Sequence, residues 1–261
     1  MQKNMQTAAE AQSATSDCPY GLCNGSGTIT ERRNGMIYAR NCKCMADRIQ
    51  KKRLKFADIP PEFTGLKVSD FSTDIYTSNK DRRIALNAKK VVIGYVKNFD
   101  AMADMGKGLY FYSATKGSGK TRLAVSLGNA LINKCGVIVK YTTTIRLLNE
   151  IRETFDNREG RTQAELIADT VASQVLILDD IGVEKPTPWA EEILYTILNE
   201  RMISKKITVF TSNLSANELR LDERIRDRVK RMAMPVVCPE ESVRQILACR
   251  ENDEIMKKLL G

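Results

Sequence analysis

The sequence predicts an α/β domain in which helices flank a parallel β-sheet, preceded by a small cysteine-bounded module. Helical and strand patterns alternate over most of the 261 residues, as they do in proteins with parallel sheets. The run "VLILDD", residues 175–180, is a continuous apolar strand of the kind buried on both faces of a sheet. The segment "GSGKT", residues 117–121, follows a strand and opens a helix, which is the context of a phosphate-binding loop.

Composition narrows the class of protein. An apolar content of 43% can supply a core, and 41 Lys and Arg against 32 Asp and Glu give a net charge of +9. This excess favours a polyanionic partner such as nucleic acid or nucleotide phosphates, although a solvated basic surface has the same composition. Histidine is absent, which excludes histidine-based acid/base chemistry. No apolar run reaches the length of about 18 residues that spans a bilayer, and the polar N-terminus is unlike a signal peptide. We therefore expect a cytoplasmic protein with no membrane partner.

Three segments are expected along the chain. Residues 1–17 are polar and predict a disordered tail. Residues 18–58 predict a module with a hairpin strand at 36–40 and a basic helix over 45–58. The prolines of "IPPEFTG" break that helix, and the main α/β domain follows over residues 59–261.

The module contains four cysteines in a C-x4-C and C-x-C arrangement, Cys18, Cys23, Cys42 and Cys44. In a reducing compartment this grouping indicates a zinc site, which must be all thiolate because the chain has no histidine. Zinc would stabilise a module too small to have a core of its own. Free thiols and disulfides are the alternative interpretations.

Within the main domain, apolar spacing predicts a helix over 84–99, and buried strands are expected at 108–113, 137–143, 175–180 and 207–213. The helix that opens at Lys120 can end at Gly136. Thr144 is expected to cap the next helix, Thr162 with Glu165 forms a capping box, and Thr187-Pro188 begins a helix through Glu200. Ser215 with Glu218 forms a second capping box.

The phosphate loop departs from the usual pattern at its start. The first glycine of G-x-x-x-x-G-K-[ST] is replaced by Ala114, which costs little if its φ stays negative. Lys120 can reach the β and γ phosphates, and the Thr121 hydroxyl can hold Mg²⁺. The expected nucleotide-binding residues are Gly117, Ser118, Gly119, Lys120, Thr121 and Arg122.

Polar residues at the ends of the next strands complete the expected site. Asp179 can orient Mg²⁺ and Asp180 can position or deprotonate the attacking water, unless "LILDD" simply ends in a solvated turn. Asn213 can bond the γ-phosphate or the water, although asparagine also commonly ends strands. The arginines of "ERIRDRV", including Arg228, are either a solvated helix face or a source of a finger on the ATP of an adjacent subunit.

These residues together resemble a known family. The segments "IPPEFTGLKVSDF", "GLYFYSATKGSGKTRLA", "LILDDIGVEKPTPWAEEILYTILNERM", "TVFTSN" and "ERIRDRV" are similar to the AAA+ ATPase module of DnaC/DnaI-type replicative helicase loaders, including relatives carried by phages and prophages. The resemblance covers residues 59–250. The cysteine module resembles the zinc-binding, helicase-contacting domain of the DnaI type, which the transposase helper IstB typically lacks although it shares the ATPase module.

The resemblance implies roles for individual residues. Lys120 and Thr121 match the Walker A lysine and threonine, and Asp179 matches the magnesium aspartate. Asp180 stands where many AAA+ proteins have glutamate, and its shorter side chain predicts slow hydrolysis. The remaining matches are Asn213 with sensor 1, Arg228 with the trans-acting finger, Arg244 with sensor 2, and Trp189 with an aromatic residue that contacts single-stranded DNA. A tryptophan in the first turn of a helix is as often a packing anchor.

The resemblance therefore implies an ATP-dependent loader with ATP, Mg²⁺ and Zn²⁺ as cofactors. It would bind a hexameric DnaB-type helicase and single-stranded DNA, assemble as a ring or spiral, by analogy a hexamer, and hydrolyse ATP slowly unless DNA or a partner stimulates it. The alternatives are a transposition helper ATPase and a helicase-binding adaptor or inhibitor with little ATP turnover.

Overall fold

The computed structural model describes residues 18–154, 160–182 and 187–260. The chain divides into two compact units, Met1–Lys52 and Arg53–Gly261, and the boundary falls within helix α1 (Lys43–Ala57). The tail expected over residues 1–17 lies outside the described residues, and the domain limits expected at residues 58 and 59 remain predictions. None of the helices in the described ranges is both long and apolar enough to cross a membrane.

The first unit is built on a β-hairpin. Strands β1 (Thr28–Arg33) and β2 (Met36–Asn41) pair antiparallel, with Arg33 opposite Met36. The two residues between them, Asn34 and Gly35, have φ values of 50° and 79°, which is the left-handed pair that a type I′ turn requires. Every residue of β2 is exposed, and the buried residues that cluster in this unit are cysteines, Cys18, Cys42 and Cys44. The hairpin is thus confirmed, and the cysteines supply the buried side-chain cluster of this unit.

The second unit contains a parallel five-stranded sheet with the strand order β4-β5-β6-β3-β7. Strand β6 lies between β3 and β5, so three strands bearing predicted site residues end side by side at one edge of the sheet. The strands are β3 (Gly108–Tyr112), β4 (Val139–Thr143), β5 (Val175–Asp179), β6 (Ile207–Ser212) and β7 (Ala233–Val237).

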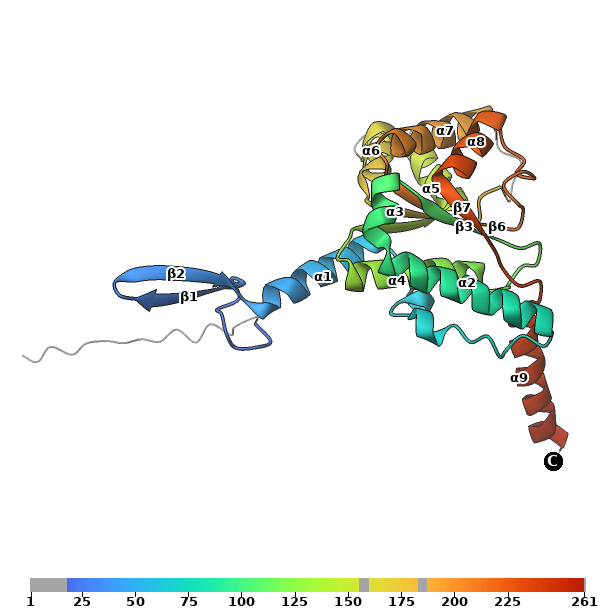
Figure 1. Ribbon diagram of the computed structural model, residues 1–261, viewed down its shortest axis with the longest axis horizontal. Coiled ribbons are helices and arrows are strands. Elements are labelled where there is room, and N and C mark those ends of the chain that lie inside the picture. Colours follow the sequence, from blue (N-terminus) through green and yellow to red (C-terminus); the bar gives the residue numbers. More distant parts are fainter. Residues whose placement is uncertain (1–17, 155–159, 183–186, 261) are drawn as a thin grey trace, which may run out of the picture. The chain divides into compact units, whose positions relative to one another are not determined.

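Helices cover both faces of this sheet (Figure 1). Because side chains alternate along a strand, Leu109 and Phe111 pack in one core cluster with α2 and α4, whereas Tyr110 packs in a second cluster with α5, α7 and α8. The helical elements of this unit are η1 (Pro61–Phe63), η2 (Val68–Asp70), α2 (Asn79–Lys97), α3 (Phe99–Met105), α4 (Lys120–Lys134), α5 (Thr144–Glu153), α6 (Gln163–Ala172), α7 (Pro188–Ile203), α8 (Glu223–Met232) and α9 (Val243–Leu260).

Two of the four predicted helix caps are confirmed; at Ser215 the predicted bond to Glu218 forms, but it closes a turn and no helix begins there. Thr162 and Glu165 form the expected capping box, and the Thr187 hydroxyl accepts from the Ala190 backbone N–H at 3.3 Å. Thr143, not Thr144, caps α5: its φ and ψ of −84° and 153° are extended, and its hydroxyl accepts from the Arg146 N–H. Thr144 is already helical, so its side chain cannot cap the helix and instead donates to the Asp179 carbonyl at 3.3 Å.

A fully buried arginine joins three elements of the second core cluster. The Arg201 guanidinium, in the last turn of α7, donates to the carbonyls of Thr170 and Ser173 at 2.9 and 2.8 Å, where α6 ends. It also donates to the Thr208 hydroxyl at 3.0 Å and to the Ile207 carbonyl at 2.5 Å, on β6. Burial lowers the pKa of Arg201 to about 9. The charge is balanced by carbonyl dipoles at the helix end, with every guanidinium bond going to a neutral acceptor.

Replacing Arg201 with methionine is expected to lower the free energy of unfolding by about 3–5 kcal/mol, because several buried acceptors lose their donor together. Urea unfolding followed by circular dichroism measures the change. Arg83→Met, at an exposed position on α2, is the matched control and is expected to change stability by less than about 0.5 kcal/mol. Equal stability of the two variants would contradict this role for Arg201.

Candidate nucleotide-binding site

The loop between β3 and α4 has the backbone that phosphate binding requires. Gly117 and Gly119 have φ values of 79° and 97°, which side chains rarely adopt. A Cβ at Gly119 would lie 2.9 Å from the Phe71 ring, and one at Gly117 would lie 2.8 Å from the Ser242 hydroxyl. Ala114 is absent from the described residues with positive φ, so the missing first glycine requires no special backbone there. The departure from the usual pattern therefore leaves the two glycines that shape the loop in place.

Lys120 is held inside this loop. Its side-chain ammonium donates to the carbonyls of Ser113 and Thr115 at 3.2 and 2.8 Å, and only 6% of the residue is exposed. Burial lowers the pKa of Lys120, while nearby carboxylates raise it. Because carbonyl dipoles are weaker partners for an ammonium than phosphate is, an arriving phosphate can replace them.

Thr121 and Asp179 form the pair expected to hold Mg²⁺. The Thr121 hydroxyl, in the first turn of α4, donates to the Asp179 carboxylate at 3.0 Å. The same carboxylate accepts from the Tyr141 hydroxyl at 2.8 Å and from the Thr211 hydroxyl. These neighbours fix the carboxylate at the end of β5, and its oxygens with that of Thr121 are the hard ligands that Mg²⁺ prefers.

Asp180 lies beside this pair in a strained backbone conformation. Its φ is 56°, and its backbone N–H donates to the Thr211 hydroxyl at 2.9 Å. Burial raises the pKa of Asp180, and the neighbouring Asp179 raises it further. Strain at a polar residue beside a phosphate loop is typical of functional positions, and a raised pKa suits a group that accepts a proton from water.

One cavity of about 180 Å³ gathers most of the predicted residues. Three of its lining residues come from other elements: Asp180 follows β5, Asn213 follows β6, and Arg244 lies at the start of α9. Three segments distant in sequence thus meet at one site. The lining residues are Lys116, Gly117, Ser118, Gly119, Lys120, Thr121, Asp180, Asn213 and Arg244.

Four predicted residues are absent from the described lining of this cavity: Asp179, which lies next to it bonded to Thr121, and Arg122, Trp189 and Arg228. Arg122 is not one of the described residues that line this cavity. Its guanidinium donates to the Asp70 carbonyl at 3.1 Å. Trp189 is partly buried in the first turn of α7 against the second core cluster, with the Arg152 guanidinium 5.1 Å from its ring centroid. This packing is the alternative already considered for Trp189, and its contact with DNA stays a prediction, as does nucleotide binding by Arg122.

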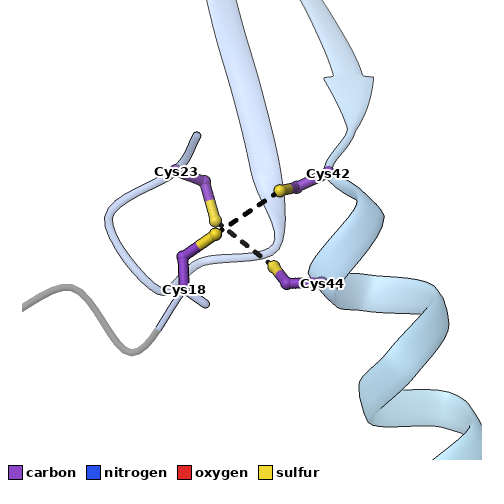
Figure 2. A group of neighbouring side chains, drawn as sticks. All are labelled: Cys18, Cys23, Cys42 and Cys44. Atoms are coloured by element: carbon purple, nitrogen blue, oxygen red, sulfur yellow. Dashed lines mark hydrogen bonds between the residues drawn. The ribbon is translucent and has the colours of Figure 1, made fainter. Parts of the chain in front are cut away.

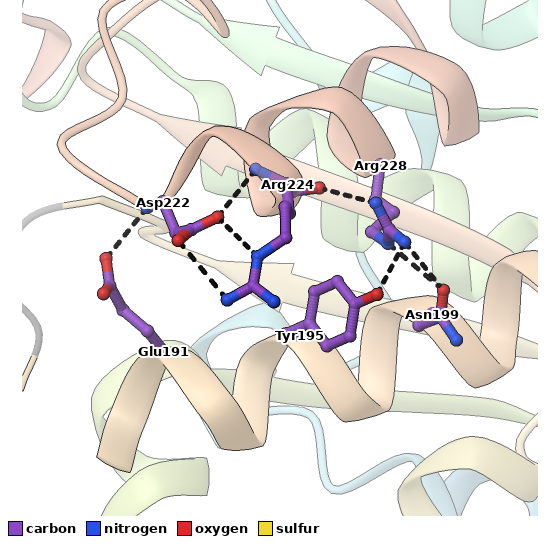
Figure 3. Close-up of polar contacts among 6 residues, drawn as sticks. All are labelled: Glu191, Tyr195, Asn199, Asp222, Arg224 and Arg228. Carbon is purple, nitrogen blue, oxygen red and sulfur yellow. Dashed lines mark hydrogen bonds and ion pairs between the residues drawn. The ribbon is translucent and has the colours of Figure 1, made fainter. Parts of the chain in front are cut away.

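Arg228 also lies outside the cavity lining, on α8, where residues of α7 hold it (Figure 3). Its guanidinium donates to the Tyr195 hydroxyl at 2.8 Å and to the Asn199 side-chain oxygen at 3.1 and 3.2 Å. The same guanidinium lies 4.4 Å from the Tyr195 ring centroid, a cation–π distance. Arg228 is therefore placed by its own chain but is not directed at its own nucleotide cavity.

Arg224 lies on the same ring, one turn of α8 earlier. Its guanidinium is 4.9 Å from the Tyr195 centroid and forms an ion pair with Asp222 at 3.0 Å. The Asp222 backbone N–H donates to the Glu191 carboxylate at 2.8 Å, which fixes the start of α8 against α7 (Figure 3). Arg224 is exposed to solvent and Arg228 is partly buried, so the choice between a solvated face and a finger stays a prediction.

Several supporting residues were missed by sequence reasoning. Tyr141 and Thr211 hold Asp179, and the buried Tyr76 donates through its hydroxyl to the Ser118 carbonyl at 2.8 Å. Tyr141 and Thr211 lie near the carboxyl ends of predicted strands, where side chains face a ligand in parallel sheets. That position was the signal that could have found them, whereas nothing in the local sequence marks Tyr76.

The four cysteines of the first unit form a compact group (Figure 2). Their sulfur atoms all lie within 4.8 Å of one another, with Cys18 to Cys42 at 3.7 Å and Cys23 to Cys44 at 3.4 Å. Tetrahedral zinc with bonds of about 2.3 Å places sulfur atoms about 3.8 Å apart, far beyond a disulfide bond of about 2 Å. The group therefore fits zinc and not a pair of disulfides.

The surroundings of Cys18 favour the thiolate that zinc binds. Burial opposes ionisation, but the backbone N–H groups of Cys23, Tyr20 and Leu22 lower its pKa to about 6. Burial raises the pKa of Cys44 to about 12.

Metal analysis of the purified protein is expected to find about one zinc per chain, bound by this cluster. Cys42→Ser is expected to lose most of the metal and the ordered hairpin, since zinc binding and folding of the small unit are linked. Cys249→Ser, at an exposed cysteine on α9, is the control and should keep the metal. A folded hairpin without metal in the unchanged protein would refute the zinc assignment.

The fold and the site together define a P-loop NTPase of the AAA+ class. The chain belongs to the family of IstB-like ATP binding proteins, whose model matches residues 5–235.

Individual relatives carry more specific names. The phage-like element PBSX protein XkdC of Bacillus subtilis is 28% identical over 86% of this chain and 82% of its own length. The replicative helicase loader DnaI of the same organism is 34% identical over 49% of this chain and 40% of its own length. A crystal structure of the DnaC helicase loader is similar with a TM-score of 0.58 and 26% identity, covering 69% of this chain and 99% of that one. This chain therefore spans less than half the length of the DnaI loader that it matches.

Proposed function

We propose that this protein is an ATP-dependent loader that binds a hexameric replicative DNA helicase and helps to place it on single-stranded DNA during replication initiation. The observation that carries the proposal is the cavity in which the phosphate loop meets Asp180, Asn213 and Arg244, in a chain whose relatives include named helicase loaders. The cysteine unit and the basic helix that follows it would contact the helicase.

Nucleotide binding and hydrolysis use different residues. Lys120 and the loop N–H groups would hold the phosphates, and Mg²⁺ on Thr121 and Asp179 would neutralise their charge. Asp180 would orient and deprotonate the attacking water. Its side chain is one methylene shorter than glutamate, so slow turnover that DNA or the helicase accelerates is expected.

Completion of the site would require a neighbouring subunit. Arg228 does not line the cavity of its own chain in the described structure, which supports action on the ATP of an adjacent copy. To do so it would exchange Tyr195 and Asn199 for phosphate oxygens. A ring or spiral of copies, by analogy a hexamer, would then switch with the nucleotide state, since ATP and ADP favour different assemblies.

Two measurements separate this proposal from its alternatives. Pull-down of a replicative helicase by the full chain is expected, and its absence would favour a transposition helper, which shares the family match. ATP turnover is expected to rise on addition of single-stranded DNA and helicase. Helicase binding without any ATP turnover would instead indicate an adaptor or inhibitor and would contradict ATP-dependent loading.

A further inference from the structure

The segment between β7 and α9, residues 238–242, forms hydrogen bonds with the phosphate loop. The Cys238 backbone N–H donates to the Tyr112 carbonyl at 2.8 Å, which continues the pairing of β7 with β3 up to the start of the loop. At the other end of the segment, the Val243 N–H donates to the Gly117 carbonyl at 3.0 Å. The segment is therefore attached to the last residue of β3 at one end and to the phosphate loop at the other.

Glu240, in the middle of the segment, binds the entrance of the loop. One oxygen of its carboxylate accepts from the Ala114 N–H and the other from the Thr115 N–H, both at 3.0 Å. Its own backbone N–H donates to the Asp81 carboxylate on α2 at 2.9 Å. Bonds from N–H groups to a carboxylate are charge-assisted and stronger than bonds between neutral groups. The loop entrance is thus fixed by a side chain at the position where the usual glycine is missing.

Glu241 makes a parallel attachment to the start of α2. Its carboxylate accepts from the backbone N–H groups of Thr77 and Ser78, both at 2.7 Å, and from the Thr77 hydroxyl at 2.8 Å. These backbone bonds lower the pKa of Glu241 to about 2 against the opposing effect of desolvation. The neighbouring Tyr76 hydroxyl holds the Ser118 carbonyl, so the same junction supports the loop at a second point.

We infer that Glu240 is a positioning residue of the nucleotide site, which sets the entrance of the phosphate loop and links it to Arg244. The inference rests on the proposed use of this cavity for ATP. Glu240 is absent from the described cavity lining, so it acts through the loop and not by touching the ligand. Arg244 follows four residues later and lines the cavity, so the segment joins the loop entrance to Arg244. A loop fixed before the ligand arrives loses less entropy on binding.

The first test follows the two N–H groups themselves. In hydrogen–deuterium exchange on the nucleotide-free full chain, Glu240→Ala is expected to speed exchange at Ala114 and Thr115 by at least about tenfold, because both lose their acceptor. Glu240→Gln keeps one acceptor oxygen, so its exchange rates are expected to lie between those of Glu240→Ala and those of the unchanged protein. Glu254→Gln, an exposed change of equal charge on α9, is the control and should leave both amides unchanged.

The second test measures affinity for a fluorescent ATP analogue. Glu240→Ala is expected to weaken binding by about tenfold, with Glu240→Gln intermediate and Glu254→Gln unchanged. Unaltered exchange at Ala114 and Thr115, or affinity within twofold of the unchanged protein, would overturn the inference. If the unchanged protein bound no ATP analogue, the proposed function would fail, and the exchange rates alone would still decide whether Glu240 holds the loop.

Discussion

Replacing Lys120 with alanine is expected to weaken ATP binding by at least about 100-fold, because the ammonium is the charged group placed to meet the β and γ phosphates. In the structure Lys120 bonds to the carbonyls of Ser113 and Thr115, which a phosphate would replace. In the proposed site the removed ammonium would contact the nucleotide phosphates. Equilibrium titration with a fluorescent ATP analogue measures the loss.

Lys116→Ala is the matched control for this change. Lys116 also lines the cavity, but it is exposed, so its removal alters the local charge equally without removing the buried ammonium. A reduction in affinity of less than about fivefold is expected from a solvent-screened charge. Unchanged affinity in Lys120→Ala would contradict the assignment of the phosphate site.

Asp180→Asn is expected to retain ATP binding and to lower ATP turnover by about 100-fold, since the amide cannot accept the proton of the water. Asparagine tolerates the positive φ of this position as aspartate does, which limits damage to the backbone. Arg228→Ala is expected to be similarly inactive if the arginine completes the site of a neighbour. Single-turnover measurements separate the hydrolysis step from binding.

Mixing the two variants tests the shared site directly. In a random equal mixture, about one quarter of interfaces pair an intact Asp180 with an intact Arg228, so about one quarter of the unchanged turnover is expected to return. If the planar guanidinium is required, a mixture of Arg228→Lys with Asp180→Asn should recover no more turnover than the mixture of Arg228→Ala with Asp180→Asn. Co-assembly of the variants with no recovered turnover would rule out action of Arg228 in trans.

The parts of the structure that could be predicted from the sequence are those with local signals. The loop glycines, the buried strand β5 and the capping box of Thr162 each depend on neighbouring residues, so local reasoning was enough. The hairpin turn at Asn34-Gly35 also depends on neighbouring residues alone. The order of the strands was not predicted, because the placement of β6 between β3 and β5 depends on contacts between distant segments.

The residues that sequence reasoning missed depend on such distant contacts. Arg201 occupies a charged position within a helix, which in sequence is typical of a solvated face, yet the carbonyls of α6 and β6 surround it. Glu240 acts across more than 120 residues on the loop entrance. The bond from Arg228 to the Tyr195 hydroxyl likewise forms only when α7 and α8 pack together. None of these roles has a local sequence pattern.

Under the proposed function, ATP binding by this chain drives placement of a replicative helicase on DNA. The most direct measurement is the amount of helicase retained on closed circular single-stranded DNA, which a closed helicase ring cannot thread. With ATP, the unchanged protein is expected to raise retention by about tenfold over helicase alone, whereas Lys120→Ala should raise it little. Equal retention with the unchanged protein, with Lys120→Ala and with no added protein would contradict ATP-dependent loading.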